Sequence, residues 1–379
     1  MMQHIFVGTS ILLPLIVSDL GLNYTEFGVA IAVSTLIGGL SQMLFGICSR
    51  KIARHVLLGL GNVLLSAGTF VTGLAHSLID FLGARTIANV GVAPQHPMGT
   101  AIVSERFEGK SVGRAIGIHY GLAYVGNIIG PLTMTFLVVV LGWRNTLFAF
   151  AVPTLIVGLI VIWYLNEGGA QESTNGEALS LKSDVMMLLK TRSVIPVVLA
   201  QALLSGGTDL GIITTYTPLF LADALKLDVY SYTYGITYTI GLVGGVVGPV
   251  LLGRHADRKG HLRTAAVSSF FAVILVYLLS VYESANLILP AHLFLLGLTS
   301  FALPTLLQSH LVTLTRSYSR DLVIGLFFTV VYVFSSLWSG VIGYMVDTYS
   351  SFTPAFYLMG TLGLMAFLTL AYQLRKPET

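Results

Sequence analysis

The sequence predicts an all-α membrane protein with twelve transmembrane helices, and three observations support this fold class. Of its 379 residues, 55% are hydrophobic and only 10% are charged, which leaves too few charges to cover the surface of a soluble domain. The charges gather in short clusters between apolar runs of about 20 residues, the length that crosses a bilayer at ~1.5 Å per residue. The twelve predicted helices are 1–18, 25–48, 55–76, 78–103, 112–140, 143–165, 194–222, 231–253, 263–282, 286–314, 322–346 and 352–373.

The basic residues predict the orientation of these helices. They fall almost entirely on alternate connections, in clusters at 50–54, 106–114, 182–192, 254–263, 316–320 and 375–376. The opposite side carries only Arg144 and Lys226. Because cytoplasmic loops are rich in Lys and Arg, we expect a multi-pass protein of the cell membrane with both termini in the cytoplasm.

The chain divides into two halves that repeat. A polar linker, 166–193, separates an N-terminal six-helix bundle at 1–165 from a C-terminal six-helix bundle at 194–379. Pro14 of the first half aligns with Pro218 of the second, and Pro94 aligns with Pro304, at an offset of about 204–210 residues. Such pseudo-symmetric halves with interrupted helices at equivalent places predict a central binding site.

The repeat also predicts that the first helix is incomplete. The seventh helix extends back from Pro218 to about residue 194, whereas only thirteen residues precede Pro14. We expect a helix truncated at its cytoplasmic end, through a misassigned start or a shortened sequence. The alternative is a naturally short helix around which the bilayer thins.

The helix predicted at 78–103 carries the most unusual polar residues. Arg85, Asn89 and His96 fall on one helical stripe, at steps of four and seven residues. An arginine within a membrane helix costs at least about 2.5–3.5 kcal/mol, so it is expected to face protein or a water-filled cavity. His96 and His119 titrate near neutral pH and are candidates for a proton relay. The alternative for each histidine is a hydrogen-bonded interior residue.

Asp209 is the acid nearest the middle of a predicted helix. It follows Ser205-Gly206-Gly207-Thr208, which predicts a break in that helix. Its carboxylate could carry a proton or could simply cap the helix that resumes after the break. Gln201, Asn127 and Gln308 are further candidates for the wall of a polar cavity, or for hydrogen bonds between helices.

A charged motif follows the eighth predicted helix. Gly253, Asp257, Arg258 and Gly260 lie at the spacing seen in the cytoplasmic turn between helices eight and nine of the major facilitator superfamily, which this motif resembles. The resemblance implies that the acid helps to latch an outward-open state. In the first half the counterpart begins at Gly46, and Arg50 stands where that acid is expected.

Other segments resemble the same superfamily. They are Arg85 itself, the segment 126–131 with Gly126, Gly130 and Pro131, and Gly142-Trp143-Arg144 before the sixth helix. We expect the first of these glycine motifs to serve helix packing. Together the motifs and the repeat imply the fold of that superfamily and a secondary transporter that works by alternating access.

Arg85 and two histidines, with no embedded acid in the same half, favour a small organic anion as the solute. Protons are the expected coupling ion, although another ion could serve, since no Gly-rich Lys-Ser/Thr nucleotide motif occurs. The alternative is a drug/proton antiporter, which the Gly-Pro motif of the fifth helix favours.

A sensor or scaffold would need a recruitment domain, for which the longest polar stretch is too short. An intramembrane enzyme is not expected either, because His-Glu-x-x-His and similar ligand spacings are missing and Cys48 is the only cysteine. We therefore expect no enzymatic activity, cofactor, metal or nucleic-acid partner. The expected partners are a small solute, the lipid bilayer and the coupling ion, and the protein is expected to be a monomer.

Overall fold

The computed structural model describes residues 6–49, 51–95, 98–99, 102–103, 111–164, 194–315 and 320–375, with side chains described except at 111–122, 210 and 320–326. These residues form helices and turns, and no strand occurs among them. Beside the α-helices there are a 3-10 helix, η1, and a π-helix, η2. The elements are η1 (Gly8–Leu12), α2 (Leu13–Asp19), α3 (Tyr24–Cys48), α4 (Arg54–Gly73), α5 (Leu78–Val92), α7 (Ser111–Tyr164), α9 (Val194–Gly207), α10 (Leu210–Leu219), η2 (Phe220–Ala224), α11 (Tyr232–Lys259), α12 (His261–Leu279), α13 (Leu289–Ser300), α14 (Leu303–Leu314), α15 (Arg320–Tyr349) and α16 (Thr353–Leu374).

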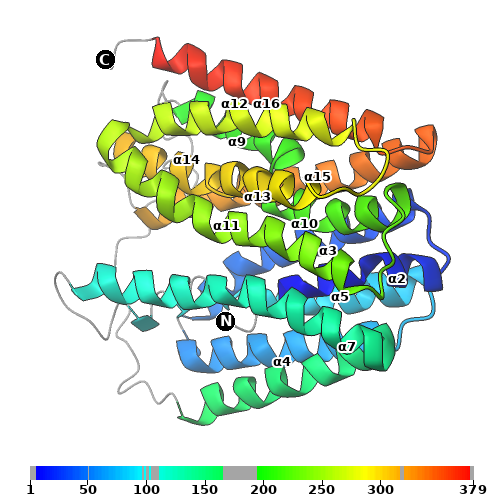
Figure 1. The fold of residues 1–379 in the computed structure, drawn as a ribbon. Coiled ribbons are helices and arrows are strands. Elements are labelled where there is room, and N and C mark those ends of the chain that lie inside the picture. The colour runs from blue at the N-terminus through cyan, green and yellow to red at the C-terminus, as the bar shows by residue number, and fades with distance from the viewer. Residues whose placement is uncertain are drawn as a thin grey trace. The chain divides into compact units, whose positions relative to one another are not determined.

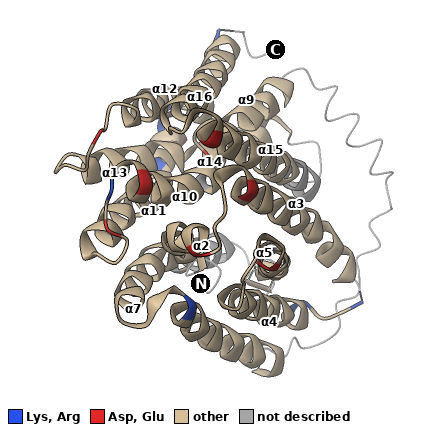
Figure 2. Ribbon diagram, turned by 90° about the vertical axis from the view of Figure 1, so that its right-hand side faces the viewer, with Lys and Arg blue, Asp and Glu red and all other residues tan. Residues whose placement is uncertain are grey.

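The helices have the length and composition of a polytopic membrane protein. Nine helical ranges in the described part of the chain are long and apolar enough to cross a membrane. One of them, Ala123–Tyr164, holds two predicted helices, because the non-helical Gly142, at φ 73°, separates them. The two remaining predicted helices correspond to the shorter Gly8–Asp19 and to α5. Figure 2 shows how few charged segments interrupt the described helices, so the predicted all-α membrane fold is confirmed.

Contacts along the chain define two compact units. One comprises Met1–Thr174 with Val229–Gly235, and the other comprises Asn175–Asp228 with Ile236–Thr379. In the first unit α4 packs against α5 and α7, and α3 packs against α5. In the second, α16 packs against both α12 and α9 (Figure 1). The predicted linker, 166–193, lies outside the described residues.

Glycines allow the backbones of α4 and α5 to touch. A Cβ added to Gly68 of α4 would collide with the backbone of Ala88, and one added to Gly91 of α5 would collide with the backbone of Leu65. Lipid gives no hydrophobic drive for two helices to associate, so close packing through small residues is what holds them together. This contact fixes the position of α5, which carries Arg85.

The prolines that align between the two halves accompany helix irregularities. Pro14 is the second residue of α2, which directly follows the 3-10 helix, and Pro218 lies inside α10 just before the π-helix. Pro304 lies in the first turn of α14, and α5 ends at Val92, shortly before Pro94. Each proline removes a backbone donor and so weakens the regular hydrogen-bond ladder.

The charged motif of the second unit has a different local structure from the predicted turn. Helix α11 continues past the predicted end at 253 to Lys259, so Gly253, Asp257 and Arg258 are helical. Gly260 alone connects α11 to α12, and its φ of 94° is one that glycine adopts without strain. His261 Nε2 lies 3.6 Å from Asp257 Oδ1, an exposed pair across this turn.

Candidate functional site

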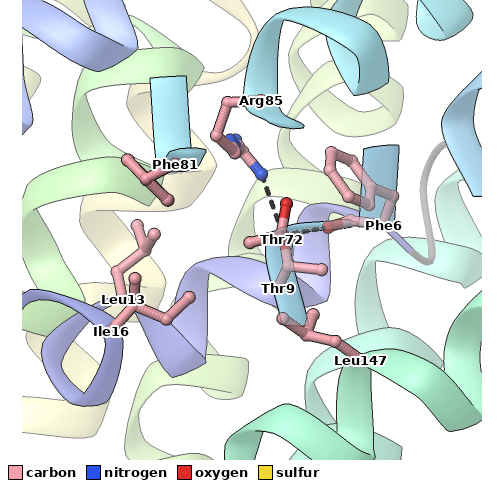
Figure 3. Close-up of a pocket in the computed structure, with 8 residues that line it drawn as sticks. All are labelled: Phe6, Thr9, Leu13, Ile16, Thr72, Phe81, Arg85 and Leu147. Carbon is pink, nitrogen blue, oxygen red and sulfur yellow. Dashed lines mark hydrogen bonds between the residues drawn. The ribbon is translucent and has the colours of Figure 1, made fainter. Parts of the chain in front are cut away.

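Arg85 lies beside a small cavity within the first unit (Figure 3). The cavity has a volume of about 10 Å³, which is close to the minimum that holds one water molecule. Among the described lining residues, Thr9 and Thr72 contribute hydroxyl groups. The remaining lining side chains are apolar: Phe6, Leu13, Ile16, Phe81 and Leu147.

The Arg85 guanidinium has few partners in this cavity. Its Nη1 donates a long hydrogen bond of 3.4 Å to Thr9 Oγ1, and its Cζ lies 5.0 Å from the centre of the Phe6 ring. Its Nε is buried and has no hydrogen-bond acceptor among the described residues. Arg85 forms no ion pair with another described residue, in contrast to Arg144, which pairs with Asp19. The cation thus has donors that a carboxylate or another oxyanion could occupy.

The two threonine hydroxyls present acceptors to the cavity. Thr9 Oγ1 donates its hydrogen to the Phe6 carbonyl oxygen at 2.8 Å, and Thr72 Oγ1 donates to the Gly68 carbonyl oxygen at 2.7 Å. A hydroxyl carries one hydrogen and two lone pairs. Both hydroxyl hydrogens are already donated to the backbone. A bound molecule could therefore interact only with the lone pairs of the two hydroxyl oxygens, which accept hydrogen bonds.

A close backbone contact holds Phe6 and Thr9 next to Arg85. Helix η1 packs against α7, and a Cβ added to Gly8 would lie 2.6 Å from Pro131 N and 2.9 Å from Gly130 O. A side chain at Gly8 would therefore push η1 away from α7. Gly126, Gly130 and Pro131 are all buried here, and their predicted packing role remains a proposal.

The other polar residues predicted in the first half do not line this cavity where their side chains are described. Asn89 packs on α3, because its Cβ would lie 2.9 Å from a Cβ added to Gly38. Asn127 is buried on α7. His96 and the side chain of His119 lie outside the described part of the chain.

Asp209 marks a helix break in the second unit, at the place that the sequence predicts. Helix α9 ends at Gly207, and Asp209 is the N-cap of α10. Its Oδ2 accepts hydrogen bonds from the Gly211 N–H at 3.1 Å and from Ser335 Oγ at 3.3 Å. Asp209 is only 7% exposed, so its carboxylate caps α10 from inside the protein.

Other predicted polar residues flank this break. Gln201 is fully buried on α9, where its Nε2 donates to Ser205 Oγ at 3.4 Å while its Oε1 has no partner among the described residues. The buried Thr208 hydroxyl also has no partner within the described residues. Gln308 is half-buried on α14.

Arg144 joins three segments of the first unit. Its Nη1 donates to the carbonyl oxygens of Gly73 at 2.9 Å and Ala75 at 2.8 Å, just where α4 ends. Its Nη2 forms a 2.7 Å ion pair with Asp19 at the end of α2, and its Cζ lies 4.3 Å from the centre of the Trp143 ring. The guanidinium therefore ties α2 and α4 to α7 and has a structural role.

Sequence reasoning missed the partners of both central residues. Phe6, Thr9 and Thr72 surround Arg85, and Ser335 contacts Asp209. Threonine and serine occur throughout the apolar helices, where they commonly bond to their own backbone. The sequence therefore did not distinguish Thr9, Thr72 and Ser335 from the other threonines and serines of the chain.

Comparison with known proteins gives a consistent result. The profile of a family described as "Major Facilitator Superfamily" matches residues 5–339. Over 147 residues the chain is 28% identical to a "Probable L-galactonate transporter" of Escherichia coli, covering 39% of this chain and 32% of that protein. It is 24% identical over 241 residues to the "Riboflavin transporter RibZ" of Clostridioides difficile, covering 62% and 51%. The chain thus spans about one third of the length of the first relative and about half of the length of the second.

A longer alignment and a solved structure extend the comparison. Over 306 residues the chain is 24% identical to the "Multidrug resistance protein MdtG" of Proteus mirabilis, covering 78% of this chain and 74% of that protein. The fold matches a mutant of the nucleoside transporter NupG with a TM-score of 0.82 and 13% identity, covering 99% of this chain and 97% of that one. At this identity the structural likeness shows the fold alone.

Proposed function

Because this chain belongs to the Major Facilitator Superfamily, we propose that it is a membrane transporter of small solutes rather than an enzyme, and that it carries a small organic anion held by Arg85. The observation that carries this proposal is the incomplete pairing of the guanidinium. Its strongest described contacts are a 3.4 Å hydrogen bond and an aromatic ring. The part of this charge that is buried, which includes Nε, is costly unless it is paired, so an anion that pairs with Arg85 gains more here than in solvent.

The size of the cavity adds a requirement. A space of about 10 Å³ admits a water molecule but not a carboxylate group. Binding must therefore enlarge the cavity, and the Phe6 ring lies against the guanidinium, whose Cζ is 5.0 Å from the ring centre. We propose that the substrate carboxylate displaces this ring. The E. coli relative is named for L-galactonate, which is a carboxylate.

We propose that transport proceeds by alternating access and is coupled to protons. The buried Asp209 carboxylate is the proposed proton carrier, since acids within membrane spans commonly serve proton transfer. Its hydrogen bonds from Gly211 and Ser335 stabilise the charged form, and uptake of a proton would weaken them. We further propose a monomer in the cell membrane with both termini in the cytoplasm, as the distribution of basic residues predicts.

The second candidate function is export of lipophilic cations in exchange for protons. The observation that favours it is the same buried acid, because a carboxylate at a helix break could bind a cation in place of a proton. The alignment with MdtG, which is named for multidrug resistance, is in keeping with this alternative. The two functions require different residues: Arg85 for an anion and Asp209 for a cation.

Flux in liposomes tests the proposal. Protein reconstituted into sealed liposomes should accumulate radiolabelled D-gluconate when a pH gradient is applied in one of the two directions. Arg85→Gln should abolish this accumulation, whereas Arg375→Gln, at the exposed end of α16, should not. Accumulation of tetraphenylphosphonium in place of gluconate, with dependence on Asp209 and not on Arg85, would contradict the anion proposal and support export of cations.

A further inference from the structure

We infer that the anion bound at Arg85 is a monocarboxylate carrying hydroxyl groups close to its carboxylate, that is, a hydroxy acid. This inference rests on the proposed function, because it assumes that Arg85 holds the carboxylate. It goes further by naming the substrate class from the remaining groups of the cavity. Thr9 and Thr72 are proposed to accept hydrogen bonds from the substrate hydroxyls (Figure 3).

The state of the two threonines carries the argument. Each hydroxyl hydrogen is donated to a carbonyl oxygen of the chain, at 2.8 Å for Thr9 and 2.7 Å for Thr72. The lone pairs that remain on each hydroxyl oxygen can accept a hydrogen bond but cannot donate one. An alcohol group of a substrate is a donor and matches them, whereas a carboxylate oxygen is an acceptor and does not.

Binding would also free one of these acceptors. Thr9 Oγ1 accepts the long hydrogen bond from Arg85 Nη1. When a carboxylate takes up the guanidinium with shorter, charge-assisted bonds, that lone pair becomes available. A hydroxyl on the carbon next to the carboxylate lies within reach of the same residues, because Thr9 already contacts Arg85.

The rest of the cavity disfavours a second negative charge. Among the described residues that line it, Arg85 is the only cation, and the five side chains besides Arg85 and the two threonines are apolar. A second carboxylate would lose its water and gain neither a cation nor a donor, at a considerable cost. A plain fatty acid avoids that cost but leaves both threonine acceptors unused.

Three six-carbon probes test this inference: D-gluconate, hexanoate and adipate. They share chain length and differ in hydroxyl groups and in the number of carboxylates. In calorimetric titration of the whole purified protein, gluconate should bind roughly 3- to 10-fold tighter than hexanoate for each hydroxyl that is engaged. Adipate should bind most weakly.

Substitutions of threonine by valine test which hydroxyl group contributes to gluconate affinity. Thr72→Val should reduce gluconate affinity roughly 3- to 10-fold and leave hexanoate affinity unchanged. Thr69→Val is the matched control, because Thr69 is buried on the same helix, donates to Leu65 O at 2.7 Å and does not line the cavity. Thr9→Val provides a second test if Thr72→Val fails to fold, as judged by its melting curve.

The outcomes separate the inference from the proposed function. Equal binding of all three probes that is lost in Arg85→Gln would overturn the hydroxy-acid inference and keep the anion proposal. Equal effects of Thr72→Val and Thr69→Val on gluconate would likewise overturn the inference. If none of the three probes binds the intact protein, both proposals fall.

Discussion

Removing the Arg144 side chain should destabilise the first unit by about 4 kcal/mol. Each hydrogen bond from the charged guanidinium to the carbonyl oxygens of Gly73 and Ala75 contributes about 1.5 kcal/mol, the low end for a charged donor, because the Arg144 side chain is 29% exposed. The ion pair with Asp19 adds only about 0.5 kcal/mol, because the Asp19 side chain is 47% exposed and the pair is screened by solvent. Stacking on Trp143 adds a similar amount.

Comparison of two substitutions shows which contacts matter. Arg144→Lys keeps the charge but lacks the planar fork that reaches two carbonyl oxygens and Asp19 together, so we expect about half the loss of Arg144→Ala. Asp19→Asn should cost less than about 1 kcal/mol. Thermal unfolding of the purified variants, followed by tryptophan fluorescence at low and high salt, measures the ranking.

The salt dependence of thermal unfolding can refute this account of Arg144. Because most of the stabilisation comes from hydrogen bonds to the end of α4, high salt should leave most of the Arg144→Ala loss in place. If Arg144→Lys unfolds at the wild-type temperature, or if high salt removes the whole difference, the bonds to the α4 carbonyls do not stabilise the protein as argued.

The remaining predictions concern packing, the aromatic contact and the helix break. Gly68→Ala should lower the melting temperature, because the added Cβ would collide with the backbone of Ala88. Gly83→Ala has open space around the added Cβ and should raise the melting temperature slightly through helix propensity. Equal shifts of the two melting temperatures would refute the packing argument. Phe6→Leu should tighten gluconate binding about 2- to 10-fold in calorimetry, because it removes the competing ring, and unchanged or weaker binding would contradict displacement of that ring. Asp209→Asn should retain the helix cap and the melting temperature but lose the gluconate accumulation that a pH gradient drives. Asp209→Ala should in addition cost about 1 kcal/mol of stability, because it removes the cap. Full proton-driven accumulation of gluconate by the Asn variant would exclude Asp209 as the proton carrier.

Features set by local sequence were predictable. The apolar runs gave the helices, and Gly206 with Gly207 signalled the break before Asp209, because glycine favours irregular backbone and aspartate caps helices. The end of α11 was predicted too early. The charged residues after 253 suggested a turn, but a helix can continue into water with charged side chains, and only Gly260 ends it.

Features set by long-range packing were not predictable. Arg85 stood out from the sequence because an arginine is costly within a membrane helix. Its neighbour Thr9 lies 76 residues away along the chain, and Ser335 lies 126 residues from Asp209. Neither pair has a periodicity or motif that would link its members. Arg144 was recognised within a motif, but its bonds to the end of α4 required the structure.

The most direct test of the central claim is calorimetric titration of D-gluconate into the purified wild-type protein and into Arg85→Gln. The loss of a charge-assisted contact at a half-buried site should weaken binding roughly 10- to 100-fold. Arg375→Gln should bind as the wild type does, since its exposed side chain lies at the end of α16. Equal gluconate affinity in the wild type and Arg85→Gln would contradict the claim that Arg85 holds the anion.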